Sequence, residues 1–481
     1  VWTTLGLVLL LFTGVLTTVI TKFFQVTHIG HWWKNTIGSL FKKDVIGHSE
    51  DKQISPFQAL CTALAATIGV GNIAGVAAAI TIGGPGAVFW MWVAAFFGMM
   101  TNYSENVLGI YFRRKNAKDE WSGGAMYYLR DGLGKKKNCS VIGKVLAGLF
   151  CIFTMLASFG IGSMGQVNKI VANVAAAFDV KAISSIEVLG GISLYNVIIG
   201  VVIMILTALI TLGGLKRIAA VAEKIVPFMV VLFVAGSLVI IAINYNAIIP
   251  AFKAIFVNAF SPEAFVGGGI GAVISKVVTQ GFKRGVFSNE AGLGSAPIAA
   301  AAAQTKEPVR QGLVSMTGTF LDTIIICSMT GISIVLTGAN EYAQANGLEG
   351  VDVTTYAFKQ GLPFPEQVSA VILMLCLVFF AFTTILGWDY YSERCLEYLT
   401  GGEKKPIKVF RWLYIIAVFV GPYMTVSAVW TIADIFNGMM AIPNMIALFA
   451  LSGVVAKETK KFFAKMKNDD FETVATEANE E

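Results

Sequence analysis

Charged residues are scarce in this 481-residue chain: Asp, Glu, Lys and Arg make up only 14% of it, whereas apolar residues make up 56%. A soluble protein of this length would need far more polar side chains to cover its surface. The mean hydropathy of +0.70 therefore indicates a protein that lies in a membrane. The formal net charge of +6 comes with no nucleic-acid recognition motif, so nucleic acid is not an expected partner.

Histidine and paired cysteine are also nearly absent. The only three histidines, His28, His31 and His48, fall in one segment, and the six cysteines form no C-x-x-C pair. The sequence contains no H-E-x-x-H motif, nucleophile elbow or phosphate loop. These absences argue against the common zinc, redox and hydrolytic sites, so we expect neither an enzyme nor a bound cofactor.

Long apolar runs take the place of charge. A helix needs roughly 20 apolar residues to cross a membrane, and the runs here reach that length without the alternation of a membrane barrel. They predict an all-α integral membrane protein with eleven transmembrane helices. The predicted spans are 2–21, 57–82, 86–111, 143–177, 195–215, 218–243, 265–282, 311–337, 366–390, 409–427 and 435–456.

Lys and Arg gather in every second loop of this topology. With the N-terminus placed outside, the inner loops hold 31 basic residues, and the outer loops hold only three, Lys181, Lys253 and Lys359. Cytoplasmic loops of membrane proteins carry such an excess. We therefore expect a multi-pass protein of the cell membrane with its N-terminus outside and its C-terminus in the cytoplasm.

Glycine interrupts two of the predicted spans. The second span contains Gly69–Gly75 (GVGNIAG), and the seventh contains Gly267–Gly271 (GGGIG). Broken helices at corresponding positions of two halves indicate the binding site of a transporter. Close packing through small residues is the alternative interpretation, but the paired positions favour broken helices.

An unwound segment frees carbonyls for a sodium ion or an ammonium, and N–H groups for a carboxylate. A zwitterionic amino acid fits such a site without any charged side chain. Thr62, Thr67 and Asn72 are the polar candidates of the first broken span. Gln166 and Asn168, deep in the fourth span, are either site residues or ties between helices, because a buried amide needs a partner.

Adjacent hydroxyl groups mark the ninth span. Thr383 and Thr384 precede Trp388 there, and hydroxyl oxygens are hard ligands that suit sodium. The alternative is that both hydroxyls bond back to their own helix.

Four charged residues fall in or near the predicted spans: Glu105, Lys276, Asp322 and Asp434. Structural ion pairs are the plainer interpretation of charges in such places. Proton transfer is the other interpretation, and Glu105 or Asp322 would then be the proton carrier.

Three stretches resemble the sodium:alanine (or glycine) symporter family. Residues 83–98 (GGPGAVFWMWVAAFFG) look like the signature of this family, and Ala65–Gly75 and Lys283–Ala303 (KRGVFSNEAGLGSAPIAAAAA) are similar to it as well. The resemblance implies the leucine-transporter-like fold of the amino acid–polyamine–organocation superfamily. That fold has five-plus-five inverted repeats with two broken helices, here with one added peripheral helix.

This fold divides the chain into five parts. They are a peripheral transmembrane helix at 1–22, an inner-face amphipathic linker at 23–56, a first core repeat at 57–243, a second core repeat at 265–456 and a cytoplasmic tail at 457–481.

The resemblance also implies which residues bind the ligands. Ala65 and Ile68 would offer carbonyls to one sodium ion, beside Thr383 or Thr384. The substrate pocket would be lined by Thr67, Gly69, Gly71, Phe265, Gly267, Gly268 and Ile270, with Trp388 as a wall. Asn72 and Gln166 complete the expected substrate site. A second sodium site with Thr67 and Asn72 departs from the family pattern, because Phe265 stands where a hydroxyl is expected; Asp322 would have to compensate.

The expected function is import of small neutral amino acids, alanine and possibly glycine in its substrate range, by sodium symport with alternating access in a lipid bilayer. A proton-coupled amino acid transporter is the alternative. From another class, the chain would be a channel, with currents far above carrier turnover, or a membrane sensor, which would usually carry a soluble signalling domain.

Overall fold

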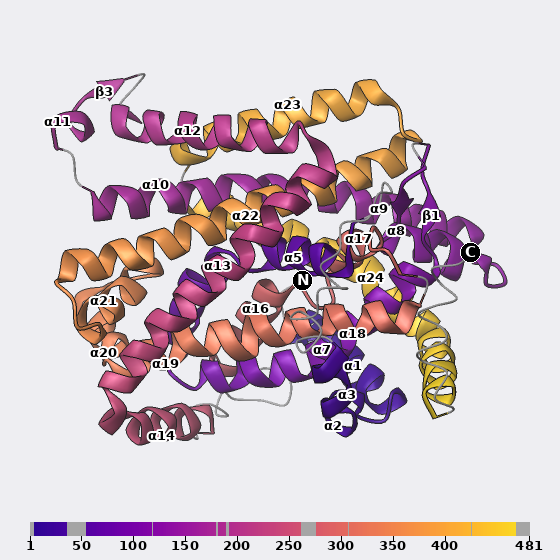
Figure 1. The fold of residues 1–481 in the computed structure, drawn as a ribbon, viewed down its shortest axis with the longest axis horizontal. Coiled ribbons are helices and arrows are strands. Elements are labelled where there is room, and N and C mark those ends of the chain that lie inside the picture. Colours follow the sequence, from indigo (N-terminus) through magenta and orange to yellow (C-terminus); the bar gives the residue numbers. More distant parts are fainter. Residues whose placement is uncertain are drawn as a thin grey trace.

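The computed structural model describes residues 4–35, 54–117, 119–178, 181–188, 192–260, 276–305, 307–424 and 426–467. Helices dominate these residues (Figure 1). In the first half of the chain they are α1 (Thr4–Ile20), α2 (Phe24–Thr27), α3 (Ile29–Asn35), α5 (Pro56–Thr67), η2 (Gly71–Gly75), α6 (Val76–Gly83), α7 (Ala87–Tyr111), α8 (Ala125–Tyr127), η3 (Tyr128–Gly132), η4 (Leu133–Lys135), α9 (Ser140–Ala157), η5 (Ser158–Met164), α10 (Gly165–Ala177), α11 (Lys181–Ser184), α12 (Leu194–Thr211) and α13 (Gly214–Ile243).

The second half is equally helical. Its helices are η6 (Tyr245–Ala247), α14 (Ile248–Ala259), α16 (Lys276–Asn289), α17 (Ala296–Ala300), α18 (Pro308–Thr319), η7 (Phe320–Cys327), α19 (Ser328–Leu336), α20 (Ala339–Asn346), α21 (Val351–Gly361), α22 (Glu366–Thr400), α23 (Lys404–Val420), η8 (Gly421–Tyr423) and α24 (Val426–Lys467). Two short antiparallel hairpins complete the described elements: β1 (Arg114–Lys115) with β2 (Trp121–Ser122), and β3 (Glu187–Val188) with β4 (Ile192–Ser193).

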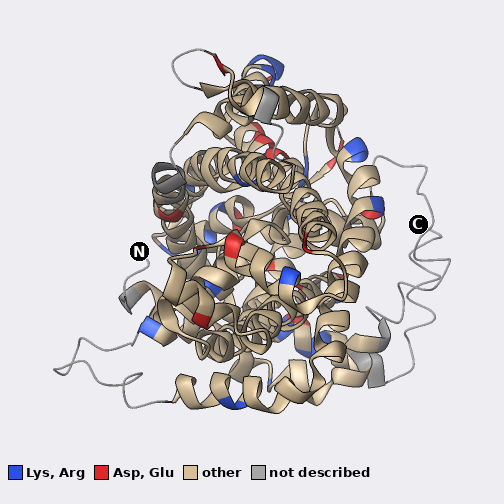
Figure 2. Ribbon diagram, turned by 90° about the vertical axis from the view of Figure 1, so that its left-hand side faces the viewer, with Lys and Arg blue, Asp and Glu red and all other residues tan. Residues whose placement is uncertain are grey.

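Long apolar helices confirm the predicted all-α membrane fold. In the described part of the chain, seven helices are long and apolar enough to cross a membrane, and the bent pair α5/α6 brings the number to eight. The total of eleven spans stays a prediction. Figure 2 looks at the end that carries α11, α20 and α21, and most of the ribbon there is free of charged residues.

Several described connections lie at opposite ends of the molecule, as the predicted topology requires of them. In Figure 1, α11, α20 and α21 lie at the left-hand end, whereas α8, β1 and the yellow end of α24 lie at the right-hand end. The left-hand end thus carries connections that we predicted outside the cell, and the right-hand end carries connections that we predicted inside. The absolute orientation stays a prediction.

The predicted first broken helix is present. Residues 57–67 and 71–83 pass together as one apolar span but are bent by 52°. A capping box at Ser55 and Gln58 starts α5. Its end at Thr67 follows from Ile68, whose φ of −76° and ψ of 96° lie outside the helical region.

The prediction for the seventh span is wrong at its C-terminal end. The predicted span ends at residue 282. The structure continues α16 to Asn289. Lys283 bonds the Asp434 carboxylate of α24 at 2.6 Å, a partner that local sequence cannot reveal. The predicted break at Gly267–Gly271 lies outside the described residues.

A different break separates α16 from α17. Glu290, Gly292 and Gly294 have φ values of 57°, 95° and 81°, so the chain turns sharply through the left-handed region. Residues Ala296–Ala300 then form the short, buried helix α17. We call Glu290–Ser295 the second break.

The free ends of α5 and α17 are tied together. The N–H of Ile54 donates to the carbonyl of Ala302 at 3.4 Å, and the N–H of Gln304 donates to the carbonyl of Ile54 at 2.9 Å. The Arg113 guanidinium donates to three carbonyls of the same segment, those of Ala301, Ala303 and Thr305. Burial lowers the pKa of Arg113 to about 10, so this tie keeps its charge at neutral pH.

Candidate functional site

The first break, Ile68–Val70, is the centre of the candidate site. Two of its N–H groups donate to side chains, whereas the N–H of Ile68 still donates to the Leu64 carbonyl at 2.8 Å. The N–H of Gly69 donates to Asn72 Oδ1 at 2.8 Å, and the N–H of Val70 donates to Gln166 Oε1 at 3.3 Å. The second amide comes from α10, so two predicted site residues of different helices meet at one unwound turn.

Thr384 completes this arrangement from α22. Its hydroxyl donates to the carbonyl of Ile68 at 3.2 Å. A Cβ at Gly69 would lie 2.5 Å from Thr384 Oγ1 and 3.4 Å from Gln166 Oε1. Only glycine leaves room for both polar groups at the break, which explains the residue type at position 69.

Thr383 and Thr384 differ in what they face. Thr383 bonds back to the carbonyls of Phe379 and Phe380, both at 3.0 Å, and its hydroxyl also lies 3.5 Å from Met229 Sδ. Thr384 also bonds a carbonyl of its own helix, that of Phe380 at 3.0 Å, but its hydroxyl reaches the Ile68 carbonyl of the break as well. The structure thus places one hydroxyl of the predicted pair at the break.

The other predicted site residues make different contacts or lie outside the described residues. Thr67 bonds back to the carbonyls of Ala63 and Leu64. A Cβ at Gly71 would lie 3.4 Å from Phe287, so this residue packs against α16. Ala65 is fully buried on α5. The other four predicted lining residues, Phe265, Gly267, Gly268 and Ile270, lie outside the described residues.

A buried carboxylate, that of Asp322 on η7, extends the polar network. It accepts hydrogen bonds from Asn72 Nδ2 at 2.6 Å, Ser288 Oγ at 2.8 Å and Thr323 Oγ1 at 2.7 Å. Asn72 therefore bridges the unwound backbone and an acidic group. Sequence reasoning singled out Asp322 as a charge in the membrane but gave no role to Ser288 or Thr323, since hydroxyl residues in apolar helices are common.

The second break is held by two other carboxylates. Glu105 Oε1 accepts hydrogen bonds from the N–H groups of Gly292 and Gly294, both at 3.0 Å, and from Asn444 Nδ2 at 2.5 Å. Glu290 accepts from the Trp388 indole N–H at 3.0 Å and from the Ser295 hydroxyl at 2.5 Å.

Trp388, the predicted pocket wall, is thus a partner of the second break. It is fully buried, and a Cβ at Gly162 would lie 2.4 Å from its own Cβ. Glu290 was missed in the sequence, although an acidic residue between apolar stretches was the available signal.

Comparisons with known proteins identify the family of this chain. The model of the sodium:alanine symporter family matches residues 1–476. The chain belongs to this family. The sodium/alanine symporter AgcS of Methanococcus maripaludis is 46% identical over 469 residues, which cover 98% of this chain and 96% of that protein. The putative sodium/proton-dependent alanine carrier protein YrbD of Bacillus subtilis is 36% identical over 463 residues, 94% of this chain and 88% of that one.

Membership of the sodium:alanine symporter family confirms the predicted class: a sodium-coupled amino acid transporter and a multi-pass membrane protein, not an enzyme. Among solved structures, a Na+-coupled sialic acid symporter in a substrate-bound outward-open state aligns with a TM-score of 0.47 at 12% identity, covering 95% of this chain and 86% of that one.

Proposed function

We propose that this chain imports alanine together with sodium, and that other small neutral amino acids, including glycine, share the same site. The family and the name of the Methanococcus relative support sodium and alanine as the transported pair. Within the chain, the proposal rests on one observation: hydroxyl, amide and backbone groups from α5, α10 and α22 meet at an unwound turn.

Sodium binds, in this proposal, between Thr384 and the end of α5. Thr384 Oγ1 and Ile68 O lie 3.2 Å apart. Two oxygens that each bind one hard cation at about 2.3–2.6 Å can have this separation. The carbonyl of Ala65, three residues earlier on α5, is the third ligand that we assign. Sodium would replace the hydrogen bond between the two oxygens.

The substrate carboxylate binds at the N–H groups of Gly69 and Val70. These groups precede the helix formed by η2 and α6, whose N-terminal end carries partial positive charge. They are bonded now to neutral amides, Asn72 and Gln166, which a carboxylate can displace at small cost. Thr67, Gly71 and Trp388, together with Phe265, Gly267, Gly268 and Ile270, form the rest of the proposed pocket.

The pair Thr383/Thr384 provides the test, because the two residues are chemically identical neighbours with different surroundings. We expect Thr384→Ala to raise the sodium concentration for half-maximal alanine uptake by about tenfold, as loss of a ligand worth about 1–2 kcal/mol would do. Thr383→Ala should leave it within about twofold. The measurement is uptake of labelled alanine into proteoliposomes over a range of sodium concentrations. Equal sodium activation in both variants would contradict the assignment.

Transport would alternate between two openings, with the N-terminus outside and the C-terminus in the cytoplasm. In this proposal the core repeats at 57–243 and 265–456 move against each other, and α1 stays peripheral. Orientation can be measured with cysteines at two exposed positions, Ala345→Cys and Lys405→Cys, in a Cys139→Ser background. An impermeant thiol reagent should label the first in intact cells and spare the second.

Proton coupling is the second candidate, because an acidic group, Asp322, bonds the Asn72 side chain that holds the first break. The Asp322 carboxylate is buried, and the hydrogen bonds that hold it come from three neutral groups, so it could exchange a proton during transport. In sodium-free proteoliposomes, a pH gradient should then drive alanine uptake in the wild type but not in Asp322→Asn. Absence of proton-driven uptake in the wild type would exclude this candidate.

A further inference from the structure

A separate cavity of about 420 Å³ lies beside the first broken helix. Its wall on one side is Ala74, Gly75 and Ala78, which follow the break directly. Another wall runs from Ala343 near the end of α20 to Gly350, just before α21. The volume falls within the range of about 300–1,000 Å³ typical of small-molecule sites. We call this cavity the vestibule.

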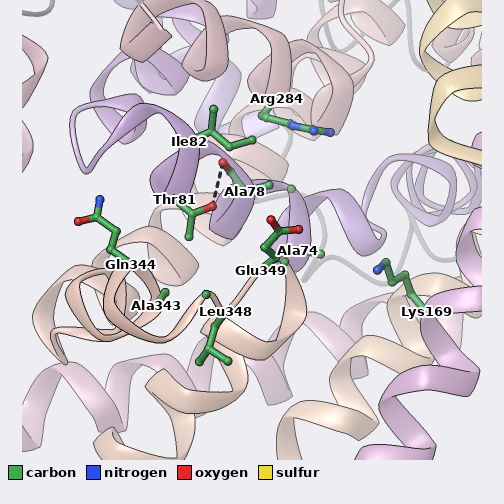
Figure 3. Close-up of a pocket in the computed structure, with 13 residues that line it drawn as sticks. Ala74, Ala78, Thr81, Ile82, Lys169, Arg284, Ala343, Gln344, Leu348 and Glu349 are labelled. Carbon is green, nitrogen blue, oxygen red and sulfur yellow. Dashed lines mark hydrogen bonds between the residues drawn. The ribbon is translucent and has the colours of Figure 1, made fainter. Parts of the chain in front are cut away.

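Three charged side chains line the vestibule, each from a different element. Lys169 comes from α10, Arg284 from α16 and Glu349 from the loop between α20 and α21. Figure 3 shows the Lys169 amine, the Arg284 guanidinium and the Glu349 carboxylate around the same hollow. The other lining groups are small, apolar or amide residues.

The loop that carries Glu349 has a defined shape. Gly347 and Gly350 have φ values of 66° and 57°, a conformation that glycine adopts without strain. These two glycines bracket Leu348 and Glu349, so the loop turns back on itself and presents the carboxylate at the cavity. Glu349 is exposed, whereas Lys169 is partly buried, so the cation is fixed in the wall and the anion lies at the rim.

We propose that the vestibule is a second binding site for a zwitterionic amino acid, which occupies it before reaching the first break. Lys169 and Arg284 bind the carboxylate, and Glu349 binds the ammonium. Lys169 and Arg284 also interact electrostatically with Asp352 and Asp434 outside the lining, so the cavity is not a site for a free anion. Its lining offers both signs of charge, as a zwitterion requires. The inference rests on the proposed function, since the ligand is the transported substrate.

Position and composition both favour this order of events. The vestibule adjoins Ala74 and Gly75 at the end of the unwound region, so a ligand there is next to the proposed substrate site without sharing its groups. Its charged groups remain partly exposed to solvent, which permits fast exchange, whereas the groups at the first break are neutral and buried.

Equilibrium binding of labelled alanine to the purified full-length chain, at saturating sodium, tests the proposal directly. We expect two alanine molecules per wild-type chain and one per Lys169→Gln chain, with the second restored in Lys169→Arg. In proteoliposomes, Lys169→Gln and Glu349→Gln should each raise the KM for alanine by at least about tenfold, the loss expected for one charge-assisted hydrogen bond. The maximal rate should change by less than about twofold.

Lys253→Gln serves as the matched control, because Lys253 is an exposed cation on α14 outside the vestibule. It should leave both stoichiometry and KM unchanged. One bound alanine per wild-type chain, or an unchanged KM in Lys169→Gln and Glu349→Gln, would overturn the vestibule site while sodium-driven uptake persisted. Failure of the wild type to show sodium-driven uptake would instead overturn the proposed function.

Discussion

The two breaks of this transporter are held by different chemistry. At the first break, the side chains that bond the backbone are two amides and a hydroxyl, from Asn72, Gln166 and Thr384. At the second break, the Glu105 carboxylate bonds two backbone N–H groups, and the Glu290 carboxylate joins the turn to Trp388. One break is bonded by neutral groups, and the other is bonded by acidic ones.

This difference suggests different roles: the hydrogen bonds of the first break can be exchanged for bonds to a ligand, whereas those of the second break fix its backbone conformation. A hydrogen bond contributes about 1 kcal/mol net. Glu105 Oε1 accepts three of them at the second break, whereas each side chain of the first break makes one bond to the unwound backbone. In the proposed function, sodium and substrate therefore displace the side chains of the first break, while the second break stays formed as a rigid partner.

The largest effect should follow from removing the acid at the second break. Glu105→Ala leaves the N–H groups of Gly292 and Gly294 without their acceptor in a fully buried site. We expect it to lower the free energy of unfolding by about 3 kcal/mol or more, since each orphaned buried group costs about 1–3 kcal/mol. Thermal unfolding of the purified protein, followed by tryptophan fluorescence, measures the loss.

Glu105→Gln is the control, because the amide oxygen can still accept hydrogen bonds from the backbone N–H groups. It should lose less stability than Glu105→Ala. At the first break, Gln166→Ala should unfold near the wild-type temperature while transport falls. If Gln166→Ala destabilises the protein as much as Glu105→Ala does, the contrast between the two breaks does not hold.

Local sequence predicted the first break but did not reveal the break at Glu290–Ser295. The run Gly69–Gly75 interrupts an apolar span, and such an interruption is visible in one window of the chain. The end of α16 depends on Lys283 and its partner Asp434, which lies 151 positions away. α22 likewise runs ten residues past the predicted end at 390, where Arg394 pairs with Glu120, which lies 274 positions away.

The candidate site shows the same limit at the scale of single residues. The sequence identified both hydroxyls of the pair Thr383/Thr384, but not which one faces the break. That choice depends on the rotation of α22 about its axis, which packing against α5 decides: a Cβ at Gly387 would lie 2.6 Å from that of Ala66. Sequence periodicity shows which residues share one face of a helix, but only tertiary contacts show which element that face packs against.

An intermediate effect should follow from adding one methyl group at the first break. In Gly69→Ala the new Cβ would lie 2.5 Å from Thr384 Oγ1, so the hydroxyl must turn away from Ile68. We expect sodium-driven alanine uptake to fall by at least about tenfold, equivalent to about 1.4 kcal/mol, with the unfolding temperature little changed. Initial rates of uptake in proteoliposomes measure the loss.

Gly71→Ala is the matched variant, two residues further along the same segment. Its Cβ would lie 3.4 Å from Phe287, an ordinary packing distance, so uptake should stay within about threefold of the wild type. Equal losses at both positions would mean that the helix break tolerates no side chain anywhere, and that Thr384 has no special role.

The smallest effect, and the one that links the two breaks, concerns Trp388. This residue lies one helical turn beyond Thr384 on α22, yet its indole N–H donates to Glu290 at 3.0 Å. Trp388→Phe keeps an aromatic ring but removes the donor, so it should lower stability by about 1 kcal/mol and leave substrate selectivity unchanged. Thermal unfolding measures the first effect, and competition assays measure the second.

Trp388→Ala also removes the bulk of the ring. If Trp388 limits the size of the substrate, this variant should weaken alanine uptake and let valine or leucine compete. The change corresponds to about 1–3 kcal/mol, or roughly 10–200-fold, for each methylene admitted. Competition by the larger amino acids in Trp388→Ala but not in Trp388→Phe would show that the ring limits substrate size and that its N–H serves the second break. Continued exclusion of both amino acids in Trp388→Ala, with normal alanine uptake, would move the size limit elsewhere, and Ile270 would be the next residue to test.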